Sequence, residues 1–330
     1  MTTNSNHRSP RLLYTGRGAV RIALLVATFW MPPAFAAEPF PVRSVQVIVP
    51  FASSGSVDAM ARYTSAALSL LLGQQFIVVN REGASGTIGF TQLAHARPDG
   101  YTLGFGPTTP ISIAPHMMKD IKYGAESFEY ICQVFENVFL IAVPRESPFR
   151  SITDLVAAAR ASPGKLTYGN TGIGTVGHLS VANFLYRSGL DAVSVPYRTN
   201  FLPDLLSGRL SFGALTVAQI AGREDMRVLA VFADRRHPAH PDAPTFAELN
   251  MPSMPPGLNG LYAPKGTPRE VLATLERACA SVTESEPLRM AGQRLNAPIL
   301  YLNGAAFSER AQTDFRYKGE LIRALKITAE

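Results

Sequence analysis

The chain has 330 residues, more than one hydrophobic core usually serves, so its length favours two domains or one large α/β domain. With 46% hydrophobic and 17% charged residues, it is too apolar for a disordered chain and too evenly mixed for a protein with many membrane spans, and its two cysteines exclude a disulfide-dense scaffold or a cysteine-rich metal site. The formal charge of +6 suggests nucleic acid or a membrane surface as a partner, provided that the charges lie in the folded part.

Residues 1–36 have the pattern of a cleavable signal peptide. Four arginines precede an apolar run, Ile22–Met31, and Ala34-x-Ala36 then fits the small-residue rule of signal peptidase. The alternative is a membrane anchor, but a membrane span needs roughly 20 apolar residues, and this run is shorter. We therefore predict export to the periplasm, with cleavage near Ala36 or Ala37.

Removal of the signal peptide changes the charge of the protein. The four arginines leave with it, so lysine plus arginine falls from 31 to 27 against 25 acidic residues, and the net charge becomes +2. The basic character thus belongs largely to the signal peptide, and we expect no nucleic acid partner. The remaining chain has no apolar stretch of spanning length either, so we expect a soluble protein. We also expect a monomer.

Strand and helix patterns alternate after the signal peptide. Their order is strand, helix, strand, helix, strand, over Val45–Val49, Ser56–Leu72, Phe76–Val79, Thr87–Ala96 and Tyr101–Phe105. This order predicts a parallel sheet with helices on both faces. In the first helix the apolar stripe includes Ala59, Tyr63 and Leu70.

A second α/β unit follows the strand expected at Val138–Val143. Ser151-x-x-Asp154 is a capping box that begins a helix, and Thr267-Pro-Arg-Glu270 is a second one. Between them we expect strands at 166–168, 193–195 and 227–232 and helices at 178–187 and 204–206. Two more helices are expected, one from the second capping box to about Thr283 and one over residues 307–326. They form either a tail or a return to the first unit.

Four turns rich in glycine, serine or threonine follow strands and form the candidate ligand site. Backbone N–H groups at a helix start have no partner in the helix and carry partial positive charge, so they can bind an anion. The first turn, residues 50–58, adds serine hydroxyls and Asp58, which either caps the helix or contacts the ligand. The second turn, residues 83–89, is either an ordinary turn or an anion site. The third turn, residues 104–109, offers two threonines.

The fourth turn, Gly172-Ile-Gly-Thr-Val-Gly177, matches the G-x-G-x-x-G pattern of dinucleotide sites. A Rossmann fold also needs an acidic residue at the end of the next strand, but that strand ends in Val195-Pro-Tyr-Arg198. A smaller anion is therefore the better ligand, beside Thr175 and His178. The His178 side chain either contacts this ligand or caps its helix.

Catalytic and metal-binding patterns are absent from the sequence. It contains no G-x-S-x-G elbow, no P-loop and no H-E-x-x-H, and its six histidines have no metal-ligand spacing. Two alternatives stay open for Cys132 and Cys279. They either pair in an oxidising compartment or remain two buried thiols, because each lies in an apolar run.

Strings along the whole mature chain resemble Bug-type extracytoplasmic solute receptors, which are the substrate-binding proteins of tripartite tricarboxylate transporters. The matching strings, in chain order, are Val47-Ile-Val-Pro-Phe51, Gly55-x-x-Asp58, Gly86-Thr-Ile-Gly89, Pro98-Asp-Gly-Tyr-Thr-Leu103, Gly174-Thr-x-x-His178-Leu179, Val195-Pro-Tyr197 and Ala263-Pro-Lys-Gly-Thr-Pro268. The resemblance implies a type II periplasmic-binding-protein fold, with two α/β lobes joined by crossing strands and a ligand cleft between them. Residues 37–140 and 257–330 would form the first lobe and residues 141–256 the second.

The resemblance also implies the function. A small carboxylate would be held by backbone N–H groups and waters, and hinge closure would pass it to membrane permease subunits or a sensor kinase, with no cofactor and no metal. The alternative is a secreted α/β enzyme acting on a small anionic substrate, with His178 near Thr175 and Asp58. The expected ligand-binding residues are Phe51, Ser53, Ser54, Gly55, Asp58, Ser85, Thr108, Thr109, Gly174, Thr175, His178 and Tyr197.

The chain departs from the family pattern at four places. Ala52-Ser-Ser-Gly55 replaces the usual Pro-Pro-Gly-Gly, which adds hydroxyls to the first turn. Between Tyr197 and Asp204 the chain is about two residues shorter than usual, and Arg198-Thr-Asn200 replaces the customary Lys-Gly. Ser211 and Asn259 stand where the family commonly has aspartate and tryptophan.

Overall fold

A computed structural model describes residues 40–53, 55–197 and 200–328 of the protein. The predicted signal peptide lies outside the described residues, as do Ser54 of the first turn and residues 198–199. Of the helices in these ranges, none combines the length and the hydropathy that a bilayer crossing needs.

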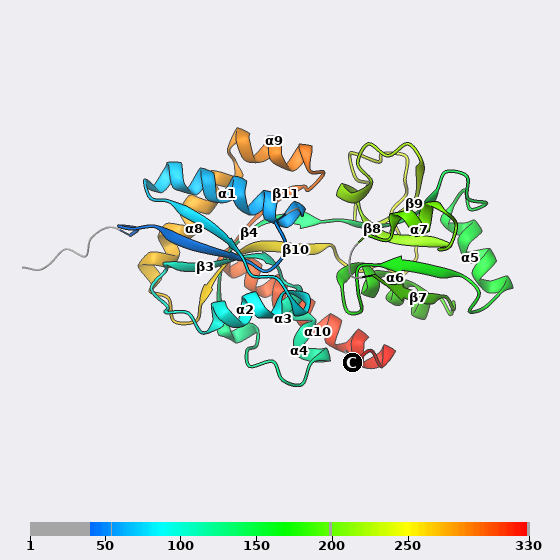
Figure 1. Cartoon of the computed structure of the whole chain (residues 1–330), viewed down its shortest axis with the longest axis horizontal. Coiled ribbons are helices and arrows are strands. Elements are labelled where there is room, and N and C mark those ends of the chain that lie inside the picture. Colours follow the sequence, from blue (N-terminus) through cyan, green and yellow to red (C-terminus); the bar gives the residue numbers. More distant parts are fainter. Residues whose placement is uncertain (1–39, 54, 198–199, 329–330) are drawn as a thin grey trace, which may run out of the picture. The chain divides into compact units, whose positions relative to one another are not determined.

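The first lobe is built on a six-stranded sheet with the order β11-β4-β10-β3-β1-β2 (Figure 1). Near one edge of this sheet, β1 (Val45–Val49) pairs in parallel with β2 (Phe76–Asn80) and β3 (Thr102–Pro107). The valine and isoleucine side chains of β1 are buried because helices cover both faces of the sheet. The helices and short helical turns of this lobe are α1 (Ser56–Leu72), η1 (Ala84–Gly86), α2 (Thr87–Ala94), α3 (Thr109–Ser112), α4 (Ala114–Met117), η2 (Ala125–Ser127), α8 (Arg269–Thr283), α9 (Glu286–Arg294) and α10 (Gly304–Leu325).

This sheet is mixed, whereas the strand order predicted a parallel one. β10 (Gly257–Pro264) runs antiparallel to both β3 and β4 (Phe128–Asn137), and β11 (Ile299–Asn303) runs antiparallel to β4. The chain leaves the lobe along β4 and returns along β10, so these neighbouring strands necessarily point in opposite directions. The prediction holds only for the βαβα segment at the start of the lobe.

The second lobe has a five-stranded mixed sheet with the order β7-β6-β8-β5-β9. β6 pairs in parallel with β7 and β8, and β5 pairs antiparallel with β8 and β9. The elements are β5 (Phe139–Pro144), α5 (Ile152–Ala161), β6 (Thr167–Asn170), α6 (Val176–Arg187), β7 (Val193–Pro196), α7 (Leu202–Leu206), β8 (Phe212–Thr216), η3 (Val217–Ile220) and β9 (Met226–Phe232).

Two segments connect the lobes. β4 passes through Val138 into β5, and β9 is followed by residues 233–256 and then β10. A small apolar cluster spans the junction, where Ile113 from the α3–α4 segment, Leu321 of α10 and Leu179 of α6 are buried together. The C-terminal helix therefore contacts the second lobe as well as the first sheet.

One of the two predicted capping boxes is present. The Ser151 hydroxyl accepts a hydrogen bond from the Asp154 N–H at 3.1 Å, and the Asp154 carboxylate accepts from the Ser151 N–H at 2.9 Å. The prediction of the second capping box is wrong. Pro268 is the residue that precedes α8, and the Thr267 hydroxyl instead donates to the Pro264 carbonyl at 2.8 Å, because the turn after β10 brings that carbonyl within reach.

The buried face of α1 is also different from the predicted stripe. Met60, Ala61 and Leu68 face the core, whereas Tyr63 is 39% exposed and Leu70 88% exposed. The buried face includes the small side chains of Thr64 and Ser65, which let the helix lie close to the sheet. The buried face is therefore a mixed one, and not the apolar stripe that the spacing predicted.

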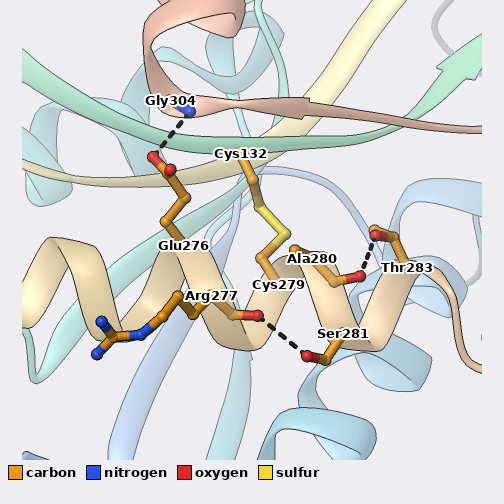
Figure 2. Close-up of a disulfide and its surroundings, with 8 residues drawn as sticks. All are labelled: Cys132, Glu276, Arg277, Cys279, Ala280, Ser281, Thr283 and Gly304. Atoms are coloured by element: carbon orange, nitrogen blue, oxygen red, sulfur yellow. Dashed lines mark hydrogen bonds between the residues drawn. A yellow bond between two sulfur atoms is a disulfide. The ribbon is translucent and has the colours of Figure 1, made fainter.

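A disulfide joins Cys132 of β4 to Cys279 of α8, as Figure 2 shows. Both cysteines are fully buried in the core of the first lobe. Of the two alternatives that the sequence left open, the structure contains the bonded pair. Because 147 residues separate the cysteines, the bond links the segment that leaves the first lobe to the segment that has returned to it.

Candidate ligand-binding site

The first turn presents an open helix start. Gly55 is the N-cap of α1, with an ordinary extended backbone (φ −93°), and a Cβ atom added there would meet no heavy atom within 4 Å. The N–H groups of Ser56, Val57 and Asp58 precede the first intrahelical hydrogen bond, which joins the Ala59 N–H to the Gly55 carbonyl. Backbone donors are therefore approachable at this end of a 17-residue helix.

Asp58 holds the first turn to the neighbouring strand and is not a helix cap. Its carboxylate accepts from the Arg62 guanidinium at 2.9 and 3.1 Å and from the Asn80 amide at 2.8 Å. The same amide group donates to the Phe51 carbonyl at 2.8 Å. Burial alone would raise the pKa of Asp58, but these hydrogen bonds and the positive charge of Arg62 hold it below its usual value. Asp58 is thus an ionised support of the turn.

The second turn packs between the first and the third. Gly86 has φ +89°, and a Cβ atom added there would lie 2.9 Å from Cγ of Pro110 and 3.2 Å from Cβ of Pro50. Ser85, also in a left-handed conformation (φ 54°), lies in this turn, and the Phe51 ring also approaches Gly86. The three turns predicted for the first lobe are therefore brought together at one edge of its sheet.

The two threonines of the third turn have different surroundings. The Thr108 hydroxyl donates to Asp314 of α10 at 3.2 Å, and its N–H donates to the Leu258 carbonyl at 2.9 Å. The Thr109 side chain, 9% exposed, makes no hydrogen bond to any other described residue. Thr109 is consequently the threonine whose hydroxyl is free to donate.

The fourth turn, in the second lobe, uses most of its donors internally. The Gly172 N–H donates to Asn170 Oδ1 at 3.0 Å, the Gly174 N–H to His178 Nδ1 at 3.2 Å, and the Thr175 hydroxyl to the Gly172 carbonyl at 2.8 Å. Thr175 is the N-cap of α6. The predicted backbone donor Gly174 is therefore occupied in this structure.

His178 is a buried neutral side chain with one free donor. Its Nδ1 accepts from Gly174, so in the neutral ring Nε2 carries the proton. Burial lowers the pKa of His178 to about 4, and the ring stacks on Tyr168 with centroids 6.3 Å apart. Within the described part of the chain, Nε2–H has no acceptor. The ring therefore supports the fourth turn and keeps a donor for a ligand.

Tyr197 lies beside the fourth turn and is held there by two hydrogen bonds. Its N–H donates to the carbonyl of Asn170, the residue at which β6 leads into the turn, at 2.9 Å. Its hydroxyl donates to Asp204 at 2.6 Å, and this bond raises the pKa of Tyr197. The phenol is thus already engaged.

The fourth turn also touches the first lobe. Gly174 has φ +75°, and a Cβ atom added there would overlap the sulfur of Met117, at the end of α4, and would lie 3.5 Å from Ile113. The α3–α4 segment therefore contacts the second turn on one side, through Pro110, and the fourth turn on the other.

Sequence reasoning missed the side chains that support the turns. Asn80 and Asn170 each end a strand and bond the following or neighbouring turn, which is a signal that the sequence carries. Asp314 and Met117 carry no such local signal, because they reach the turns from other parts of the fold.

A hollow of about 600 Å³ in the first lobe lies apart from these turns. It is bordered by η2, β4, α8 and the start of α10, with Glu126, Glu129 and Lys265 among its lining residues, and none of the predicted site residues lines it. Nowhere in the described residues do three or more histidine, cysteine, aspartate or glutamate side chains gather closely enough to hold a metal ion.

Three solved structures are similar to this chain over most of its length. The periplasmic binding protein BugD is 27% identical, with a TM-score of 0.75 over 88% of this chain and 100% of that one. Rpa4515 of R. palustris with adipate is 27% identical, with a TM-score of 0.79 over 88% and 99%. MatC of Rhodopseudomonas palustris with bound malate is 25% identical, with a TM-score of 0.73 over 86% and 100%. The two lobes thus have the periplasmic-binding-protein fold that the resemblance implied.

The sequence itself matches the model of a receptor family. The match runs over residues 60–327, and the family is described as the tripartite tricarboxylate transporter family receptor, TctC. It includes the first lobe from within α1 onward, the whole second lobe and the segments that connect them. The receptors of this family bind solutes and are not enzymes, so the alternative of a secreted enzyme is set aside. We conclude that the chain belongs to the TctC family of periplasmic solute-binding proteins.

Proposed function

We propose that this receptor captures a small dicarboxylate between its lobes and closes around it. The observation that carries the proposal is the meeting of three turns at one edge of the first sheet, with the open start of α1 among them. The fourth turn contacts the other side of the α3–α4 segment, and it brings His178 of the second lobe to the site. We place the moving units at residues 37–140 with 257–330, and at 141–256.

The donors in these turns match the chemistry of a carboxylate. The first-turn N–H groups of α1, the Thr109 hydroxyl and His178 Nε2–H are all donors without an acceptor among the described residues. Hydrogen bonds to a charged group contribute about 1.5–3 kcal/mol each, so a few of them suffice for micromolar binding. Phe51, Ser53, Ser54, Ser85 and Tyr197 complete the proposed lining.

The chemical class of the ligand is inferred from the relatives. The R. palustris protein Rpa4515 was solved with adipate and MatC with malate, so related folds hold dicarboxylates of different length. We propose a ligand of this class. We also propose that the receptor delivers it to permease subunits or a sensor kinase, and that residues 1–36 direct export of the protein to the periplasm. The buried disulfide supports an oxidising compartment.

Thermal unfolding with a panel of acids tests the proposal. The panel holds mono-, di- and tricarboxylates, including malate and adipate, and the matching diamides serve as controls without charge. We expect at least one dicarboxylate to raise the melting temperature, because binding to the native state alone stabilises it. A flat response across the whole panel would contradict the proposal.

Gly55→Leu separates ligand binding from folding. The backbone at Gly55 suits any residue and has open space, so the variant should fold normally. Its side chain would occupy the approach to α1, so the stabilisation by the dicarboxylate should disappear. Ala161→Leu, an exposed change in the second lobe, is the matched control and should keep it. Gly174 is unsuitable for this test, because a side chain there would overlap Met117.

A further inference from the structure

The C-terminal helix carries a charged pair that is removed from water. Lys318 is 0% exposed and Asp314 5% exposed, and their side chains are joined at 2.6 Å. Asp314 Oδ1 is buried and has no hydrogen-bond partner among the described residues. A buried ion pair that is incompletely satisfied stabilises a fold poorly, and apolar residues of similar size often serve as well. Its presence here therefore calls for another role.

The pair bonds both ends of α3. The Thr108 hydroxyl, just before the helix, donates to Asp314 Oδ2 at 3.2 Å, and Lys318 Nζ donates to the hydroxyl of Ser112, its last residue, at 3.4 Å. The Thr108 carbonyl in turn accepts from the N–H groups of Ile111 and Ser112, at 2.8 and 2.7 Å. A four-residue helix does not hold its shape alone, so these contacts from α10 fix it.

The same face of α10 also fixes α4. His116 Nε2 lies 3.0 Å from the Phe315 carbonyl, and the two rings are 4.2 Å apart. Gly319 permits this approach, since a Cβ atom there would lie 2.5 Å from the His116 ring. Figure 1 shows α3 and α4 beside α10 at one side of the first lobe. Contacts from residues 314–319 of α10, which span less than two helical turns, thus hold the α3–α4 segment against the C-terminal helix.

The α3–α4 segment is the part that touches both sides of the ligand site. Pro110 contacts the second turn at Gly86, Met117 contacts the fourth turn at Gly174, and Thr109 offers the free hydroxyl. A shift of this segment would therefore move a ligand donor and loosen the turns on either side of it.

We propose that Asp314 and Lys318 are positioning residues, whose buried pair sets the third turn for ligand binding without touching the ligand. This role rests on the proposed function, because it assigns the third turn to the carboxylate site. It explains a charged pair that the core could replace by apolar residues. It also makes the C-terminal helix part of the binding machinery.

The test is the double variant Asp314→Leu/Lys318→Met, which removes both charges and keeps similar volumes. We expect its melting temperature to stay within a few degrees of the wild type, since a well-packed apolar pair replaces the ion pair. Hydrogen–deuterium exchange of the ligand-free protein should be at least about tenfold faster in the segment 109–117, because Thr108 has lost its anchor. Exchange in α5 of the second lobe, which is remote from this segment, should not change. If exchange over 109–117 stays at the wild-type rate, the proposal is wrong.

Ligand binding is measured separately, by titration with malate and with adipate. The double variant should bind the better of the two at least about tenfold more weakly, the loss of one positioned donor. Leu275→Ala, in the core on the other side of the sheet, is the control and should lower the melting temperature while keeping both the exchange and the affinity. If the wild type binds neither acid, the proposed ligand class fails, while the exchange experiment still decides the positioning role. Unchanged affinity in a variant with fast exchange would also overturn it.

Discussion

His178 is a buried side chain that we expect to stay neutral, and available to a ligand, near neutral pH. Its Nδ1 is occupied by the Gly174 N–H, and the ring is 6% exposed, so the charged form is unfavourable in the native state. A receptor that binds through neutral Nε2–H keeps its donor at every pH above the pKa of about 4. The binding contribution of this residue should therefore be insensitive to pH near neutrality.

The stability of the protein should, in contrast, depend on pH through His178. The pKa is about 4 in the native state and about 6.5 in the unfolded chain, so the unfolded state binds the extra proton between these values. The contribution of His178 is fully present above pH 6.5 and is lost as the pH falls toward 4. By pH 4.5 the loss should reach about 2–3 kcal/mol.

Urea unfolding at pH 7 and 4.5 measures this loss. The control is His178→Asn, whose side-chain oxygen can still accept from Gly174 but does not titrate. The wild type should lose about 2–3 kcal/mol more than the variant between the two pH values. Parallel losses in the two proteins would show that His178 does not carry the effect.

Which donors are free could not be predicted at the residue scale. The sequence placed Thr108 and Thr109 in the same turn, but Asp314 occupies the first and leaves the second free. Asp314 lies 206 residues from Thr108 along the chain, so no local pattern could reveal this bond. Asp58 is a similar case, because Asn80 and Arg62 take the carboxylate that could have capped α1.

At the element scale, the start of α10 depends on a single side-chain cap. Asn303 is its N-cap, and the side-chain oxygen accepts from the Ala306 N–H at 2.9 Å. Asn303→Ala should lower the free energy of unfolding by about 1 kcal/mol, because an N–H of the first turn loses its acceptor. Asn303→Ser should retain most of the stability, as serine also caps. Chemical denaturation of the three proteins checks this, and equal losses in both variants would argue against a capping role.

The elements that were predicted well are those with a clean local pattern. β1, β2 and α5 have short apolar runs or a capping box, and their bounds differ little from the prediction. β4 was missed because its pairing with β10 shifts register twice, with Ile131 and Val134 as the extra residues on β4, and this interrupts the two-residue alternation that identifies a strand. The face of α1 failed for another reason: the buried face includes Thr64 and Ser65, so the most apolar stripe is not the one that packs against the lobe.

At the scale of the whole molecule, the disulfide should carry a large share of the stability. It closes a loop of well over a hundred residues, which removes many conformations from the unfolded chain. Cys132→Ala/Cys279→Ala should lower the free energy of unfolding by about 2–4 kcal/mol. A reductant should weaken the wild type to the same degree and leave the variant unaffected. If the reductant lowered the free energy of unfolding of the wild type and of the variant equally, the effect would not come from this disulfide.

The same bond changes what a break in the backbone would do. All five strands of the second sheet lie between Cys132 and Cys279, so that lobe is enclosed in a covalent ring. A protease that cuts once in the exposed turn at Glu224 and Asp225 opens the ring, but the disulfide still joins the two fragments. The two fragments stay joined in the first lobe, and the second lobe is left as two pieces tethered by separate strands. Such a molecule would run as one band on a gel without reductant and as two with it.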